Sequence, residues 1–186
     1  MTFETILAIL LLGILSHNYA LLDFLGTGAV IENERSSRKS LLLGLGTTLV
    51  MVICTLITWP INKFLLVNAT YLQTMVFVLV VLVVVEVLHL IGKNILDNYC
   101  RADFVKFAIN GAVLGLCIHN AEVETLGTAL VTAAAVGLGF MVAMTVFAKL
   151  KDLEVDEKAI PAAFRGLPIA LLTACMIALA FTALQF

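Results

Sequence analysis

The chain is 186 residues long, and 62% of its residues are hydrophobic while only 13% are charged. Soluble domains have about 45–50% apolar and about 25% charged residues, so this composition excludes a soluble domain and indicates a polytopic membrane protein. The formal net charge of −2 provides no strongly basic surface, and we therefore expect the lipid bilayer, not nucleic acid, as a partner.

Six apolar stretches predict an all-α integral membrane protein. A bilayer core about 30 Å thick is crossed by roughly 20 helical residues. The predicted spans are Phe3–Leu22, Leu41–Trp59, Tyr71–Ile91, Phe104–His119, Thr125–Ala148 and Phe164–Leu184. The first stretch lacks a basic leader and a small-residue cleavage site, so we expect a retained helix and not a removed signal peptide.

Two of the six spans are predicted to be interrupted. Behind the lone Asp23, the glycines at 26 and 28 argue against a straight continuation of the first helix. In the fourth span, Asn110 and two glycines interrupt an otherwise apolar run. Non-helical backbone at membrane depth persists only where protein or water satisfies it. We therefore expect broken or re-entrant segments in helices 1 and 4, near Asp23–Ile31 and near Asn110–Asn120.

Two internal matches indicate a duplicated unit. At an offset of 92, Asn18 falls on Asn110, and its neighbours Ala20 and Leu22 fall on identical residues. At an offset of 93, Gly44-Leu45-Gly46 falls on Gly137-Leu138-Gly139. Two matches at nearly one offset predict a repeat of about 93 residues that contains three spans.

The basic residues of the loops predict the orientation. Ten of the 11 Lys and Arg residues fall in the first, third and fifth loops, and the second loop holds only Lys63. The positive-inside rule therefore predicts that both termini face outward. Three spans are an odd number of crossings, so the second copy enters the membrane from the opposite side. We predict one membrane domain, 1–186, built from the inverted repeats 1–93 and 94–186.

In transporters built from inverted repeats, the working site lies near the midplane, where broken helices meet. Asn18 and Asn110 mark that place. Either amide caps the exposed backbone at a helix break, or it takes a direct part in binding. Asp23 either orients the N–H groups of the Gly26–Gly28 turn or carries a cation or proton. His17 and His119 flank the same breaks and are more typical of hydrogen-bonded structural histidines.

Glu86 and His89 lie three residues apart, so they share one face of the third helix. They form either a proton or sodium relay or a paired couple at the cytoplasmic interface. With Asn18, Asn110 and Asp23 they are the candidate ion or proton pathway, because ionisable and polar groups inside a membrane are costly and commonly functional.

The sequence contains no nucleophile–base–acid set, so no catalytic residue is expected. We also expect no metal site. The four cysteines form no Cys-x-x-Cys pair, and those in the apolar runs are expected to be buried, reduced thiols.

Several motifs resemble a known family. They are Phe24-Leu25-Gly26, Gly44-Leu45-Gly46-Thr47-Thr48, Asn110 followed by Ala112-Val113-Leu114-Gly115, and Pro161-Ala162-Ala163-Phe164-Arg165-Gly166. Together they resemble the small six-helix membrane subunits of Rnf and sodium-pumping NADH:quinone reductase (Nqr) complexes. The Phe-Arg-Gly element favours the RnfA/NqrE branch of this family.

The resemblance implies a multi-pass subunit of the inner (cytoplasmic) membrane, which pairs with a homologous membrane protein of the RnfE/NqrD type in the opposite orientation. It also implies partner subunits that carry flavin and iron–sulfur groups, and electron flow coupled to Na⁺ or H⁺ translocation. In this family the membrane pair holds a [2Fe–2S] cluster, with one cysteine from each half of each subunit.

At those two cysteine positions this chain has Gly28 and Gly111. Iron–sulfur clusters of this kind need thiolates, which glycine does not supply. We therefore expect no cofactor from this chain alone, and a [2Fe–2S] centre at the subunit interface would need other ligands. Cys117, six residues beyond Gly111, is an alternative ligand together with His119 or His17.

The sequence thus favours a non-catalytic membrane subunit of an Rnf/Nqr-type ion-translocating electron-transfer complex. An alternative is a secondary transporter or ion channel on the same inverted-repeat scaffold, without electron transfer. A third is a purely structural assembly subunit.

Overall fold

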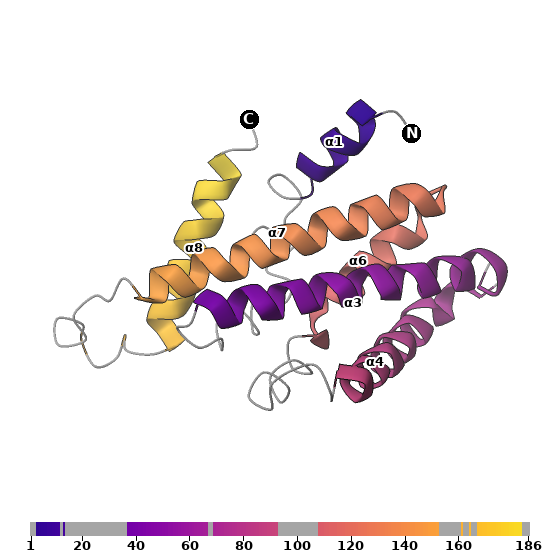
Figure 1. Cartoon of the computed structure of the whole chain (residues 1–186), viewed down its shortest axis with the longest axis horizontal. Helices are drawn as coiled ribbons and strands as arrows, with labels where there is room; N and C mark the ends of the chain where they lie inside the picture. Colours follow the sequence, from indigo (N-terminus) through magenta and orange to yellow (C-terminus); the bar gives the residue numbers. More distant parts are fainter. Residues whose placement is uncertain are drawn as a thin grey trace.

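The computed structural model describes residues 3–11, 13, 37–66, 69–92, 108–152, 161, 164 and 167–183. Within them, all regular secondary structure is helical, which confirms the all-α prediction for the described part of the chain. The helices are α1 (Phe3–Leu11), α3 (Ser37–Phe64), the 3₁₀ turn η2 (Thr70–Leu72), α4 (Gln73–Gly92), α6 (Gly111–Ala121), α7 (Leu126–Asp152) and α8 (Leu167–Thr182) (Figure 1).

Among the described residues, three helices are long and apolar enough to cross a bilayer, over Ser40–Phe64, Thr70–Ile91 and Leu126–Leu150. They correspond to the second, third and fifth predicted spans. Two shorter apolar helices, Gly111–Ala121 and Pro168–Ala180, correspond to the fourth and sixth. The described helices are therefore consistent with a membrane protein, and the six predicted crossings stay a prediction.

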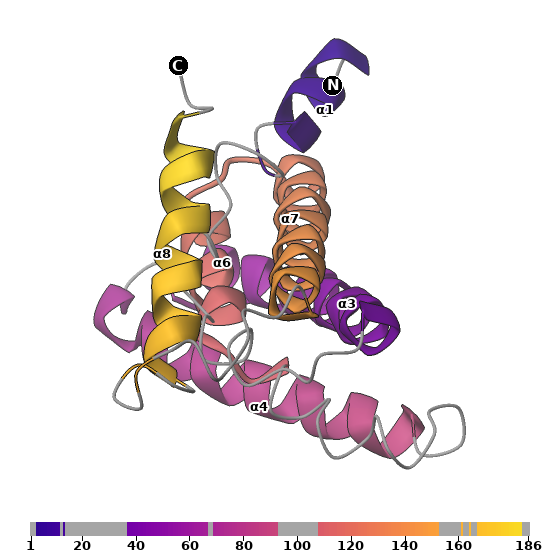
Figure 2. The ribbon, with the colours of Figure 1, turned by 90° about the vertical axis from the view of Figure 1, so that its left-hand side faces the viewer.

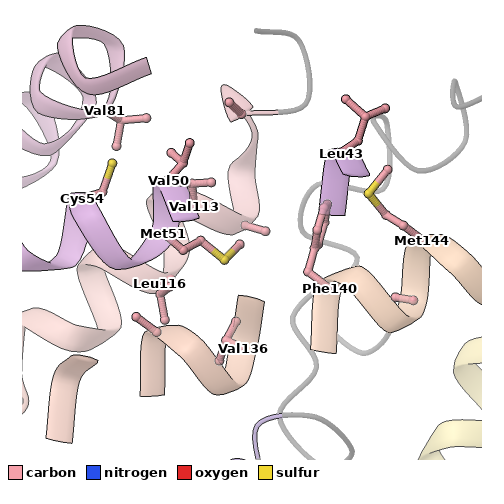
Figure 3. Packing of buried hydrophobic residues seen from close by; sticks show 14 of the residues in the cluster. Leu43, Val50, Met51, Cys54, Val81, Val113, Leu116, Val136, Phe140 and Met144 are labelled. Carbon is pink, nitrogen blue, oxygen red and sulfur yellow. The ribbon is translucent and has the colours of Figure 1, made fainter. Parts of the chain in front are cut away.

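The two longest helices, α3 and α7, lie antiparallel and side by side at the centre of the molecule (Figures 1 and 2). Helices α4 and α6 pack on α3, whereas α1 and α8 pack on α7. Figure 3 shows the core between them, where Leu43 meets Phe140 and Met144 at one end and Val50 and Met51 lie close to α6 at the other.

Glycines bring the backbones of α3 and α7 into contact. A Cβ added to Gly44 would lie 2.9 Å from the Cα of Met141, and a Cβ added to Gly137 would lie 2.9 Å from the Cα of Thr48. Small residues allow this close approach between membrane helices. The two contacts are also reciprocal, because a shift of 93 residues turns Gly44 into Gly137 and Thr48 into Met141.

The burial pattern recurs at the same offset. Eight positions of α3 and their counterparts in α7 are buried: Ser40 with Ala133, Leu43 with Val136, Gly44 with Gly137, Thr47 with Phe140, Val50 with Ala143, Met51 with Met144, Cys54 with Phe147 and Thr55 with Ala148. The buried positions of α4 and α8 match too: Phe77 with Ala170, Val81 with Ala174, Val84 with Ile177 and Val85 with Ala178. Corresponding helices therefore bury corresponding faces, although most of the paired residues differ in type.

Candidate functional site

The fourth segment is interrupted at Asn110, as the sequence predicts. Asn110 is extended (φ −133°, ψ 163°), and α6 begins only at the next residue. The Asn110 side chain accepts a hydrogen bond from the backbone N–H of Val113 at 3.0 Å, which is the geometry of a helix N-cap. The sequence allowed two roles for this amide, capping of exposed backbone or direct binding. The structure shows the capping role.

Helix α6 is a half-helix. Its 11 residues rise about 16 Å, roughly half the thickness of a bilayer core. The expected span from Phe104 to His119 thus differs from the observed helix, which runs from Gly111 to Ala121. The physical reason is the extended Asn110, which ends any helical continuity with Ala108.

The far end of α6 is fixed to α3 by three side-chain donors. Trp59 Nε1 donates to the carbonyl of Val123 at 3.0 Å, Asn62 Nδ2 to that of Ala121 at 3.0 Å, and Lys63 Nζ to that of Glu124 at 3.3 Å. The last carbonyls of any helix have no partner within the helix. Helix α3 therefore satisfies the carbonyl end of the half-helix and its following turn, and the Lys63 cation suits the negative end of the helix dipole.

A buried polar cluster lies between α3 and α6, close to the C-terminal end of α6. It consists of Cys54, Thr55 and Thr58 on α3 and Cys117 and Asn120 on α6, each with at most 1% of its surface exposed. Asn120 Nδ2 donates to Thr55 Oγ1 at 3.2 Å and to the carbonyl of Ala129 on α7 at 3.1 Å. The Thr58 hydroxyl donates to the carbonyl of Cys54 at 2.8 Å. The amide of Asn120 thus joins three helices.

Two of the cysteines agree with the expectation and a third does not. Cys54 and Cys117 are free and buried, and their side chains lie near each other between α3 and α6. Cys175 is free but exposed on α8, so the prediction of a buried thiol is wrong there. Its position on an exposed face of α8 explains the difference, because an apolar run does not say which face packs inward.

Among the described residues, the α6 position that the family resemblance implies offers no thiolate to a [2Fe–2S] cluster. Gly111 is exposed at the first turn of α6, where it offers no ligand. Cys117 lies about a third of a turn around the helix axis from Gly111. It faces the buried Cys54 and Thr58 instead of the exposed surface. A thiol enclosed between α3 and α6 is not available to a cluster shared with another chain.

The described part of the chain also contains the other candidates of α4 and α6. Glu86 is exposed and His89 is half-buried on α4, and His119 is exposed on α6. Within the described residues there is no group of three or more His, Cys, Asp or Glu side chains that would hold a metal ion. Asn18, Asp23, His17 and Gly28 lie outside the described residues, as does the predicted break near Asp23–Ile31.

Sequence reasoning missed the polar contacts that the α3–α6 interface uses. Asn120 entered only as the boundary of the fourth segment, and Asn62 was not singled out. The sequence does contain a pattern that indicates this interface. Polar residues recur every three or four positions along one face of an otherwise apolar helix, at Thr55, Thr58 and Asn62.

Comparison with known proteins identifies the fold family. A family model described as "Rnf-Nqr subunit, membrane protein" matches residues 6–186. RnfA of Syntrophotalea carbinolica, a component of an ion-translocating oxidoreductase complex, is 33% identical over 184 residues, which cover 96% of this chain and 95% of that protein. The RnfA protein of Escherichia coli is 32% identical over 90% of each chain.

A third relative, from Acetobacterium woodii, is the corresponding component of a "Na(+)-translocating ferredoxin:NAD(+) oxidoreductase complex". It is 29% identical over 183 residues, which cover 95% of each chain. The family model and the relatives agree over nearly the whole length of the chain, and they agree with its apolar helices. The chain therefore belongs to the Rnf-Nqr family of membrane subunits.

Proposed function

We propose that the chain is the RnfA-type membrane component of an Rnf/Nqr-type complex, in which electron transfer drives ion translocation. The match of the family model over residues 6–186 carries this proposal. The names of the relatives support it, because they describe components of ion-translocating oxidoreductase complexes. The chain itself performs no organic reaction, and its role is to form part of the path through the membrane.

The protein works as two inverted three-helix repeats, 1–93 and 94–186, with six crossings. The reciprocal contacts of Gly44 and Gly137 support this arrangement. The order of packing supports it as well, since α4 on α3 corresponds to α8 on α7, and α6 on α3 corresponds to α1 on α7. The antiparallel course of α3 and α7 is the relation expected between the second helices of two inverted units.

The chain resides in the cytoplasmic membrane with both termini on the outer side. Under this topology the α3–α4 and α6–α7 connections face outward. Three hydrogen bonds support the placement of these two connections on the same side of the membrane. They join the end of α3 to the α6–α7 turn, from Trp59, Asn62 and Lys63. The first, third and fifth loops, which hold most of the Lys and Arg residues, then face the cytoplasm.

The partners are a homologous membrane protein of the RnfE/NqrD type in the opposite orientation, together with subunits that bear flavin and iron–sulfur groups. Because Gly111 supplies no thiolate and Cys117 is enclosed, this chain contributes no cysteine ligand from α6 to a shared cluster. Glu86 and His89 are the candidate ion-path groups of α4. Since Glu86 is exposed, that path runs along the surface between α4 and a partner and not through the core of this chain.

Affinity purification of the full chain from its native membranes in a mild detergent tests the proposal. We expect the homologous membrane partner to co-purify in equimolar amount, along with proteins that contain flavin and iron–sulfur centres. A cofactor-free homo-oligomer that mediates substrate-dependent flux in proteoliposomes would contradict the proposal and favour a secondary transporter. Metal analysis and absorption spectra of the purified complex test the ligand assignment separately.

A further inference from the structure

The amide of Asn120 is held in one orientation at the junction of three helices. Both of its hydrogens are used, one by Thr55 Oγ1 and one by the carbonyl of Ala129. A carbonyl only accepts hydrogen bonds, so the nitrogen, and not the oxygen, must face Ala129. The oxygen Oδ1 therefore takes part in neither of these two contacts.

That oxygen is buried without a partner. Asn120 is 1% exposed, and its Oδ1 accepts no hydrogen bond from the described residues. Buried polar side chains nearly always have partners in native proteins, and inside a bilayer no bulk water relieves an unpaired group. An additional donor or positive charge is needed at this position.

The surrounding residues suit a water molecule better than a metal cation. A cation the size of Na⁺ or Ca²⁺ is bound by several oxygens, as in Ca²⁺ sites with six to eight. Beside Asn120 the described residues offer the hydroxyl of Thr55, while the Thr58 hydroxyl is already bonded to the carbonyl of Cys54. A buried water requires two to four polar partners. Asn120 and Thr55 supply the first two.

We propose that the amide oxygen of Asn120 binds an internal water molecule between α3, α6 and α7. The water donates a hydrogen to Oδ1 and takes a second hydrogen bond with the Thr55 hydroxyl. It thereby completes the contact that holds the carbonyl end of the half-helix against the two central helices. This inference rests on the polar contacts alone and does not depend on the proposed function.

Radiolytic hydroxyl labelling of the full chain in its native complex, read by mass spectrometry, tests the site. Cys117 is one turn from Asn120 on the same helical face and reports water at that position, because radicals form from bound water. Met144 is equally buried but lies with Leu43 at the other end of the core (Figure 3). Each labelling rate is divided by that of the same residue in the denatured chain. We expect Cys117 to be labelled at least about fivefold faster than Met144.

The variant Asn120→Leu, which has a similar volume but no acceptor, is expected to reduce labelling of Cys117 to the Met144 rate. A structure of the unmodified complex at a resolution that shows waters provides a measurement that needs no variant. We expect density at about 2.8 Å from Asn120 Oδ1.

Three results would overturn the proposal. Equal labelling of Cys117 and Met144 with no density would show that the site is dry. Density that appears only with sodium, at about 2.4 Å from several oxygens, would identify a cation instead. A side chain from outside the described residues that donates to Oδ1 would leave no place for water.

Discussion

The central helix α3 makes two contacts that differ in kind. Its contact with α7 depends on close packing, because a glycine of each helix lies against the backbone of the other. Against α6 it is held by polar groups, through the donors of its last turns and the buried amide of Asn120. The first contact fixes the two halves to each other. The second holds a half-helix too short to cross a bilayer, for which lipid offers no alternative hydrogen bonds.

The largest effect is expected where the shape contact is broken. Gly44→Leu and Gly137→Leu each force a side chain into the backbone of the facing helix. Overpacking typically costs about 1–3 kcal/mol, and a rigid backbone neighbour puts these variants at or beyond the upper end. We expect both to lose assembled complex, measured as the membrane yield and the thermal unfolding of the purified complex. Gly127→Leu, at an exposed position of α7, is the control, and an equal loss there would contradict the account.

The polar contact is weakened at the end of α6 by Asn62→Leu. This change leaves the partly buried carbonyl of Ala121 without its donor, and the cost is at the lower end of the about 1–3 kcal/mol that a fully buried group would lose. Amide hydrogen exchange should rise throughout α6 while exchange in α7 stays unchanged. Lys63→Gln removes an exposed charge and should change stability by less than about 1 kcal/mol. If exchange rose equally in α6 and α7, the two contacts would not be independent.

At the other end of the half-helix, Asn110→Ala removes the N-cap. Loss of such a cap costs about 0.5–2 kcal/mol and should raise the exchange rate of the Val113 amide. Asn110→Ser keeps an acceptor and is expected to restore most of the stability and all of the ion transport. If the serine variant regained stability but not transport, the amide would have a direct role beyond the cap.

The smallest effect on stability is expected at Glu86. Its side chain is exposed on α4 and belongs to neither contact, so Glu86→Gln should alter stability by at most about 0.5 kcal/mol. If Glu86 lies on the ion path, the same variant lowers ion uptake per electron in proteoliposomes by about tenfold. Unchanged uptake would exclude Glu86 from the ion path and leave the interfacial couple with His89 as the remaining interpretation.

The sequence carried a clearer signal for the shape contact than for the polar one, although it did not predict which helices meet. The Gly-x-Gly echo indicated a duplicated unit, and in the structure one glycine of each copy lies at the α3–α7 contact. The helix start at Asn110 was predictable, since amides and glycines interrupt apolar helices. The family motifs identified the fold family, which the comparisons confirm.

The α3–α6 contact was not predictable because its polar atoms find partners about 60 residues away in the chain, such as Asn62 with Ala121. Helical spacing shows that Thr55, Thr58 and Asn62 share a face, but it does not show which helix that face meets. Exposure of Cys175 was missed for the same reason. An apolar membrane helix gives little contrast between the side that packs on protein and the side that does not.

The inverted repeat is tested most directly by the sidedness of two equivalent alanines. Ala69 lies in the second loop, and a shift of 93 residues leads to Ala162 in the fifth loop. In a chain whose native cysteines are replaced by alanine, Ala69→Cys should react with an impermeant maleimide only from the outer face, and Ala162→Cys only from the cytoplasmic face. Labelling of both positions from the same face would contradict the inverted arrangement.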